Sequence, residues 1–163
     1  MPTRTVTWTD PAIYASAADL SGLELLRAIL SGALPRPPVA ELLGMRGLEV
    51  ERGRVVFEME VGEYHYSPLN IVHGGVTATL LDTVMGCAVF TMLRAGAGYT
   101  TTDLQVRYVR PVSVASGVLR AEGTVVHAGS RVMTAEGRVT DARGKLVAHG
   151  GCGCLVLTAV HGP

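Results

Sequence analysis

One aspartate stands alone in the most apolar part of the chain. Between Ile71 and Leu93, Asp82 is the only formally charged side chain. A buried carboxylate without a partner is costly, so two interpretations stay open. In the structural one, Asp82 is satisfied by a nearby hydroxyl, such as that of Thr79 or Thr83, or by a salt bridge from another element. In the functional one, it projects into a dry cleft, where a carboxylate can activate water as a general base or attack a carbonyl.

A second candidate group begins nine residues before Asp82. His73-Gly74-Gly75 marks the start of a helix, whose first N–H groups have no partner within the helix. These donors and the positive end of the helix dipole suit an oxyanion, although helix capping alone also explains the pattern. His73 and Asp82 would lie about 13 Å apart along the axis. Two antiparallel helices of a two-fold dimer would instead place Asp82 of one subunit beside Gly74 of the other.

The hydrophobic pattern predicts the elements that position these groups. Residues 71–93 predict a helix enclosed by protein, because the central carboxylate and the strands around it disfavour a membrane span. Alternating residues predict a hairpin at 46–51 and 54–61, with one wet face, and four more strands after residue 98. The short turns between them require antiparallel neighbours. The expected fold class is therefore α+β, with a curved antiparallel sheet wrapped around one long central helix.

The N-terminal part of the chain is expected to flank this body. Residues 1–18 lack periodicity and predict an irregular arm that Trp8 anchors. Ser21 and Glu24 form a capping-box pattern, which predicts a short helix that stops at Gly32. The proline-rich stretch that follows predicts a stiff connector rather than a helix.

Composition limits the class of protein. The chain has 163 residues, 48% of them hydrophobic, which is enough for a single domain, divided into an arm and flanking helix at 1–39 and a main body at 40–158. Lysine plus arginine and aspartate plus glutamate number 14 each, without a basic cluster, which argues against a nucleic-acid-binding face. Three cysteines (Cys87, Cys152 and Cys154) form no disulfide framework and no zinc pattern, so a cytoplasmic protein without a metal is expected.

Three stretches of the sequence resemble the hotdog-fold acyl-CoA thioesterases of the phenylacetate-pathway type. They are Asn70-Ile71-Val72-His73-Gly74-Gly75, Leu81-Asp82-Thr83, and the strand from Thr101 to Pro111. The resemblance covers roughly residues 40–157. It implies that Asp82 is the nucleophile or general base, that the N–H of Gly74 binds the thioester oxygen, and that His73 supports the turn.

The resemblance also implies roles for surrounding residues. Many family members carry Asn or Gln six residues before the histidine, where this chain has Ser67, so Asn70, or Ser67 acting through water, would take that role. Thr101 would orient the water. The nucleotide part of coenzyme A would bind at the surface, with Arg131 on a phosphate. The residues expected to bind coenzyme A are Gly75, Tyr108, Arg110, Val126, Gly129, Ser130 and Arg131.

These expectations describe a thioester hydrolase that uses no cofactor apart from the coenzyme A of its substrate and works as a homodimer that pairs into a homotetramer. Neither nucleic acid nor membrane is an expected partner. Two rivals remain: a hotdog hydratase or dehydratase, which needs a histidine against the carboxylate, and a non-catalytic acyl-CoA binding or sensing module. The acyl group is not identified, because selectivity would depend on how the second subunit closes the pocket and on the shape left by Tyr64, Tyr66, Met85 and Val89.

Overall fold

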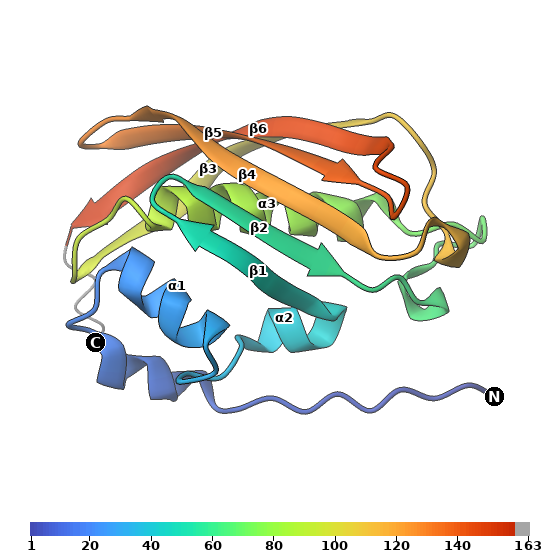
Figure 1. Cartoon of the computed structure of the whole chain (residues 1–163), viewed down its shortest axis with the longest axis horizontal. Coiled ribbons are helices and arrows are strands. Elements are labelled where there is room, and N and C mark those ends of the chain that lie inside the picture. Colours follow the sequence, from blue (N-terminus) through green and yellow to red (C-terminus); the bar gives the residue numbers. More distant parts are fainter. Residues whose placement is uncertain (159–163) are drawn as a thin grey trace.

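A six-stranded antiparallel sheet curves around one long helix, α3 (Gly74–Phe90), in the computed structural model of the chain, which describes residues 1–158 (Figure 1). Two short helices, α1 (Gly22–Leu30) and α2 (Pro38–Leu43), lie under the open side of the sheet. The strands are β1 (Met45–Glu51), β2 (Arg54–Met59), β3 (Ala97–Tyr108), β4 (Leu119–Ala128), β5 (Val132–Thr140) and β6 (Leu146–Thr158). Short 3-10 helices occupy Pro11–Ala17, Glu63–His65 and Val114–Ser116. The predicted α+β architecture is confirmed.

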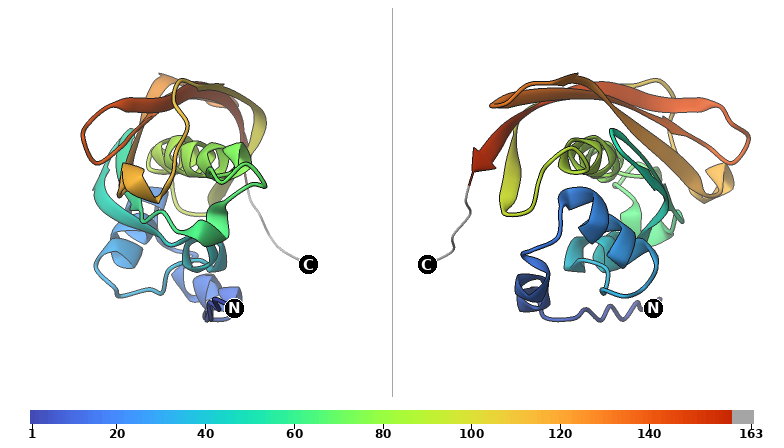
Figure 2. Two further views of the ribbon diagram at one scale, coloured as in Figure 1. Left: turned by 90° about the vertical axis from the view of Figure 1, so that its right-hand side faces the viewer. Right: turned by 60° about the vertical axis from the view of Figure 1, so that its left-hand side comes forward.

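The strand order is β1-β2-β4-β5-β6-β3, and every pair is antiparallel. The sheet arches over α3, which is seen nearly end-on in the right-hand view of Figure 2. Helix α3 buries one side completely against the sheet, through Leu80, Leu81, Val84, Met85, Ala88 and Val89. Helix and sheet touch at Gly123 of β4, where a Cβ atom would lie 2.3 Å from the carbonyl oxygen of Val84. No helix in residues 1–158 is long and apolar enough to span a membrane.

The β1–β2 hairpin forms around Arg52-Gly53 as predicted, but its outer face is not simply wet. Val56, expected on that face, is fully buried. It pairs with Glu49 and Glu122 on the two neighbouring strands. Arg54 binds both carboxylates, at 2.7 and 2.6 Å, and the three charged side chains cover the valine. A buried residue thus appears at a position where alternation predicts a solvated one.

The N-terminal arm is anchored differently from the prediction. Trp8 is 62% exposed and does not hold the arm. Arg4 does so instead, since its guanidinium donates to the carbonyl of Leu42 at 2.6 Å and lies 3.9 Å from the ring centre of Tyr64. A second anchor is the hydrogen bond from Tyr14 Oη to the carbonyl of Pro35, at 2.7 Å.

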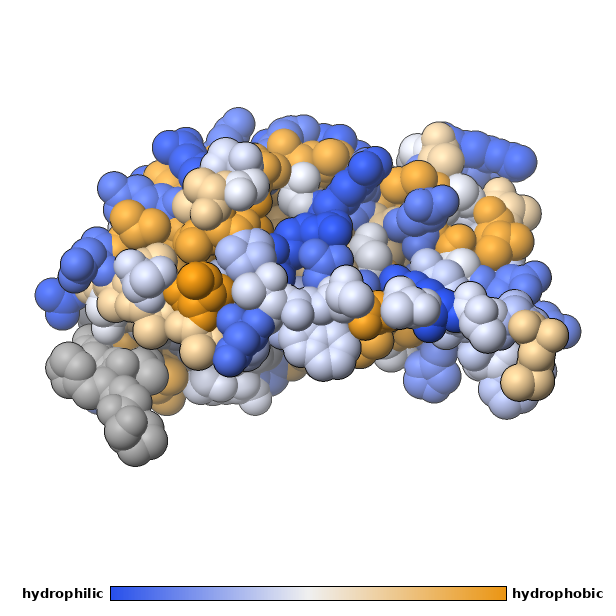
Figure 3. All heavy atoms as spheres, turned by 90° about the horizontal axis from the view of Figure 1, so that it is seen from below, coloured by the Kyte–Doolittle hydropathy of each residue, from blue (hydrophilic) through white to orange (hydrophobic). Residues whose placement is uncertain are grey.

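Helix α1 starts with the predicted capping box of Ser21 and Glu24. Helix α2 was not predicted, because its prolines suggested a connector only. Pro38 is instead the first residue of α2, where the missing N–H costs no helical hydrogen bond. The two helices cover β1, and together with the N-terminal arm beneath them they form the underside of the molecule, on which apolar patches alternate with hydrophilic side chains (Figure 3).

Candidate active site

The start of α3 leaves one backbone donor free. His73 is the N-cap, and its Nδ1 accepts a hydrogen bond from the N–H of Gly75 at 3.0 Å. The carbonyl of His73 accepts from Val76 at 2.9 Å. Within residues 1–158, the N–H of Gly74 has no hydrogen-bond acceptor, as expected for the first residue of a helix. The N–H of Gly75 is thus engaged by His73, whereas the N–H of Gly74 remains available to a ligand.

Tyr108 closes over this helix start. Its Oη donates to the carbonyl of Gly74 at 2.9 Å. A Cβ atom on Gly74 would lie 3.1 Å from the Cζ of Tyr108, so a side chain there would press on the ring. The ring also borders a pocket of about 320 Å³ whose other walls include Thr77 and Val112. Tyr108 therefore shapes the surroundings of the Gly74 donor.

Asp82 is held by a hydroxyl, but not by either predicted one. Thr101 Oγ1 of β3 donates to Asp82 Oδ1 at 3.0 Å. Thr79 and Thr83 instead donate to carbonyls of their own helix, those of Gly75 and Thr79, at 2.9 and 2.7 Å. Asp82 is only partly buried, and it faces β3, the strand at one edge of the sheet. Its second carboxylate oxygen has no protein donor in the described residues, and it can therefore accept a proton from water.

A bulge in β3 allows this strand to contact α3 at two places. Thr101 and Tyr108 are seven residues apart, and in a regular strand an odd spacing puts two side chains on opposite faces. The register of β3 against β6 shifts at Thr102, between Thr101 and Asp103. The extra residue reverses the alternation. Thr101 can therefore reach Asp82 while Tyr108 reaches Gly74.

Sequence reasoning did not place the cysteines and Tyr99 beside the carboxylate. Cys154 pairs with Thr101 across β6 and β3, and its Sγ lies 3.8 Å from that of Cys152. Burial raises the pKa of the Cys152 thiol to about 12 and also raises the pKa of Tyr99, so both stay neutral near Asp82. Gly86 faces the Tyr99 hydroxyl, which lies 2.4 Å from where a Cβ atom would be. Only pairings across the sheet could have located these groups.

The Ser67–Asn70 turn uses its polar groups locally. Ser67 Oγ accepts from the N–H of Leu69 at 3.3 Å, and the carbonyl of Ser67 accepts from Asn70 at 3.1 Å. Asn70 has a positive φ of 58°, a conformation that asparagine tolerates better than most residues. A structural reason therefore exists for both residues, and neither contacts Asp82 within this chain.

The residues assigned to coenzyme A fall into two separate groups. Val126, Gly129, Ser130 and Arg131 lie on and around the β4–β5 turn, where Val126 is 64% exposed and Arg131 is exposed. This turn lies toward the C-terminal end of α3. The N–H of Val125 donates to the carbonyl of Gly53, and the N–H of Gly53 donates to Oγ1 of Thr91, the C-cap of α3. Tyr108 and Arg110 lie at the other end of α3, with Arg110 donating to the carbonyl of Leu146 at 2.5 Å. Within one chain the two groups cannot contact the same phosphate.

The four residues predicted to shape the acyl pocket have other contacts within this chain. Met85 and Val89 are fully buried in the core. Tyr64 lies under Arg4, and the Tyr66 hydroxyl accepts from the N–H of Val114 at 2.9 Å. Because the prediction includes closure of the pocket by a second subunit, it stays a prediction.

Comparison with known proteins identifies the family. The family model described as Thioesterase superfamily matches residues 69–148. The chain is 32% identical over 139 residues to the proofreading thioesterase EntH of Klebsiella pneumoniae, across 85% of this chain and 96% of that protein. The chain belongs to the thioesterase superfamily. This membership confirms the expected class of enzyme, a thioester hydrolase, and its PaaI-like hotdog fold.

Two further relatives agree with this assignment. Acyl-coenzyme A thioesterase 13 of Homo sapiens is 29% identical over 98 residues, across 60% of this chain and 69% of that protein. A solved structure of a putative thioesterase from Ralstonia eutropha, described as related to phenylacetic acid degradation, superposes with a TM-score of 0.73. It is 28% identical and covers 80% of this chain and 98% of that one.

Proposed function

We propose that this protein hydrolyses acyl-CoA thioesters in a site shared by two copies of the chain. Asp82 takes a proton from water, or attacks the carbonyl itself, and Gly74 of the partner subunit donates its N–H to the developing oxyanion. The observation that carries the proposal is the pair of groups left unsatisfied on α3: one carboxylate oxygen of Asp82 and the N–H of Gly74. They lie too far apart along one helix to act on the same carbonyl.

The reaction needs only groups that the chain supplies. As water adds to the carbonyl carbon, its proton passes to Asp82 and negative charge develops on the thioester oxygen, where a helix N-terminus stabilises it. The C–S bond then breaks, and the thiolate of coenzyme A receives a proton as the free acid leaves. Thr101 keeps the carboxylate oriented through its 3.0 Å hydrogen bond. In the nucleophilic variant, Asp82 forms an anhydride that water then hydrolyses.

The edge of the sheet supports the dimer. In the part of the chain that the structure describes, strand β3 pairs with β6 alone, which leaves its other edge open along Ala97–Tyr108. Leu104 and Tyr108 on this strand are 38% and 54% exposed. A long unprotected edge is a surface that natural proteins cover. A homodimer is therefore part of the proposal, and its pairing into a homotetramer and a cytoplasmic location rest on the family resemblance and the three unpaired cysteines.

Coenzyme A is the proposed carrier, as the name of the human relative states for that protein. Arg131 stands exposed beside the N–H groups of the β4–β5 turn, and guanidinium with turn amides suits phosphate oxygens. The turn lies at the opposite end of α3 from Gly74 of the same chain. In an antiparallel dimer the turn comes near the shared site, and it therefore fits the same two-subunit geometry.

A non-catalytic acyl-CoA sensor is the second candidate. It is favoured by Ser67, which stands where many family members have an amide side chain. The Ser67 hydroxyl accepts a hydrogen bond from the N–H of Leu69 and so is engaged within its own turn. A hydratase is disfavoured, because it needs a histidine that acts on the carboxylate, and His73 already uses Nδ1 to cap its own helix.

An Asp82→Asn variant tests the proposal. Thiol release is measured with acetyl-, hexanoyl-, lauroyl-, benzoyl- and phenylacetyl-CoA, with and without a chelator. We expect hydrolysis by the wild type that resists the chelator, and a loss of about 10³-fold in kcat for the variant, the middle of the range that a general base contributes. Binding of the acyl-CoA should persist, because the amide is nearly the same size.

The matched control is Asp19→Asn, which makes the same chemical change at an exposed position outside the site. It should hydrolyse thioesters like the wild type. A wild-type protein that binds acyl-CoA but releases no thiol, with Asp82→Asn binding equally well, would instead establish the sensor.

A further inference from the structure

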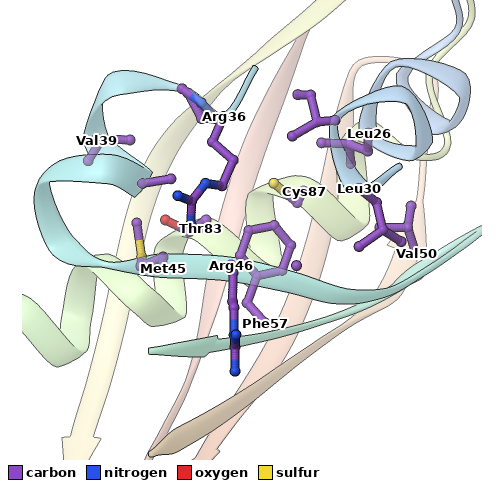
Figure 4. Close-up of a pocket in the computed structure, with 14 residues that line it drawn as sticks. Leu26, Leu30, Arg36, Val39, Met45, Arg46, Val50, Phe57, Thr83 and Cys87 are labelled. Carbon is purple, nitrogen blue, oxygen red and sulfur yellow. The ribbon is translucent and has the colours of Figure 1, made fainter. Parts of the chain in front are cut away.

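A pocket of about 290 Å³ opens between α1, α2, β1 and the central helix, and the chemistry proposed above does not use it (Figure 4). Its walls are largely apolar and come from α1, α2, both strands of the hairpin and α3. The main wall residues are Leu26, Leu30, Met45 and Phe57. Thr83 and Cys87 of α3, one turn apart, form its floor.

The floor offers no charge and no free hydroxyl proton. Thr83 Oγ1 donates to the carbonyl of Thr79 at 2.7 Å, inside the helix. Burial, together with the negative charge of Asp82, raises the pKa of the Cys87 thiol to about 12. The thiol is therefore neutral and behaves as a small apolar group.

The two cations at the rim are already neutralised. Arg36 donates two hydrogen bonds to Glu41, at 2.9 and 2.8 Å. Arg46 is paired with Glu58. Because neither guanidinium is free to bind an anion, the pocket does not suit a phosphate. Its lining suits an uncharged, apolar group.

Strand β1 leaves room for such a group. The register of β1 against β2 shifts at Leu48, next to Gly47, which borders the pocket. A Cβ atom on Gly47 would lie 3.3 Å from Leu30 Cδ1 and 3.6 Å from Phe57 Cε1, so it would point into the space between them. A glycine at this position therefore keeps open a volume that any larger residue would narrow.

The pocket adjoins the proposed reacting group. Thr83 directly follows Asp82 in α3; Asp82 faces Thr101 of β3, and Thr83 faces the pocket. We propose that this pocket holds the acyl group of the thioester, as an apolar chain of up to about ten carbons. The size follows from comparison with an apolar cavity of ~150 Å³, which holds one benzene ring. This inference rests on the proposed function, which places the thioester carbonyl at Asp82.

The test is the chain-length profile of kcat/KM, measured with acyl-CoA substrates from butyryl to palmitoyl. The wild type should have its highest kcat/KM in the range from hexanoyl-CoA to decanoyl-CoA. Gly47→Ala should lower kcat/KM for decanoyl-CoA by about 10-fold and Gly47→Val by more, because an added methyl in an apolar pocket changes discrimination by that order. Butyryl-CoA should change by less than about twofold, since it does not reach the narrowed part. Leu30→Ala should enlarge the pocket and raise kcat/KM for lauroyl-CoA relative to that for butyryl-CoA.

Gly151→Ala is the matched control, because it adds a methyl group to another strand, outside the pocket. That methyl group would lie 3.4 Å from the carbonyl oxygen of Ala135, an ordinary van der Waals contact. It should leave the profile unchanged. A wild type that hydrolyses thioesters, with Gly47→Val and Leu30→Ala altering every chain length equally or not at all, overturns the inference and leaves the proposed function standing. A wild type that hydrolyses no member of the series overturns the proposed function itself.

Discussion

At the scale of single residues, the site depends on hydroxyl groups that come from one strand. Thr101 holds Asp82 and Tyr108 holds the carbonyl of Gly74, at 3.0 and 2.9 Å. Each hydroxyl donates a hydrogen bond to an oxygen next to the atom that is proposed to act, namely Oδ1 of Asp82 and the carbonyl oxygen of Gly74. The carboxylate and the helix N–H therefore remain available to substrate while their orientations are fixed.

His65 gives a prediction about pH. It is 4% exposed, and burial, reinforced by the nearby Arg4, lowers its pKa. The unfolded chain, with a histidine pKa of about 6.5, then binds more protons than the folded chain, so stability is lost as pH falls from about 6.5 through the lower folded pKa. Urea unfolding between pH 7.5 and 5 should show this decline, and His65→Asn should flatten it. An unchanged slope in the variant would contradict the assignment to His65.

The sequence revealed single residues where a local pattern identifies them. Asp82 stands out because no other charge lies near it in the sequence, and Ser21 because its partner Glu24 is one helical turn away. The partner of Asp82 could not be chosen, since two nearer threonines offered the same hydroxyl as Thr101. The choice depends on the β3 bulge, for which no residue type in the strand is diagnostic.

At the scale of elements, the contact between α3 and β4 determines how closely the helix lies under the sheet. Gly123 of β4 meets the backbone of Val84 and Met85. Backbone atoms cannot turn aside as a side chain does. The helix that carries Asp82 and Gly74 is therefore positioned by main-chain contact as well as by apolar packing.

Gly123→Ala should consequently destabilise the fold. The added Cβ atom would lie 2.3 Å from the carbonyl oxygen of Val84, and overpacking of this kind costs about 1–3 kcal/mol. Urea denaturation of the variant measures the loss in free energy of unfolding. Gly151→Ala, with its nearest contact at 3.4 Å, serves for comparison and should be close to neutral. Equal stability of the two variants would show that helix and sheet can move apart without cost.

The elements themselves were largely predictable, because their periodicities are local properties of the sequence. The two exceptions have a common cause. Pro38 begins α2 at a position where proline is tolerated, and Val56 is buried by charged neighbours from two other strands. Neither the helix of 6 residues nor the cover over Val56 leaves a periodic pattern, since both depend on tertiary contacts.

At the scale of the whole molecule, the shared site predicts complementation between two inactive variants. Asp82→Asn lacks the carboxylate, and Gly74→Pro lacks the N–H donor at a helix position where proline is tolerated. Random mixing after unfolding and refolding gives half heterodimers, each with one intact site, so about a quarter of the wild-type activity should return. The measurement is thiol release by the mixture and by each variant alone.

Activity in the mixture that equals the mean of the two separate variants would place both groups in one chain and contradict the dimeric site. Gly74→Ala keeps the N–H and tests the steric part alone, since its methyl would meet Tyr108 at 3.1 Å. It should retain more activity than Gly74→Pro.

The position of β6 between β5 and β3 affects how the chain reaches this structure. Among the strands of residues 1–158, β3 pairs with β6 alone, and their register joins residues as distant in the sequence as Ala97 and Thr158. During synthesis, the apolar α3 and strand β3 leave the ribosome well before β6 does. Closure of the sheet over that helix must wait for the last strand, and sequence-distant pairing of this kind slows folding and prolongs exposure of apolar surface. Newly made chains are therefore most vulnerable to aggregation in the interval before β6 emerges.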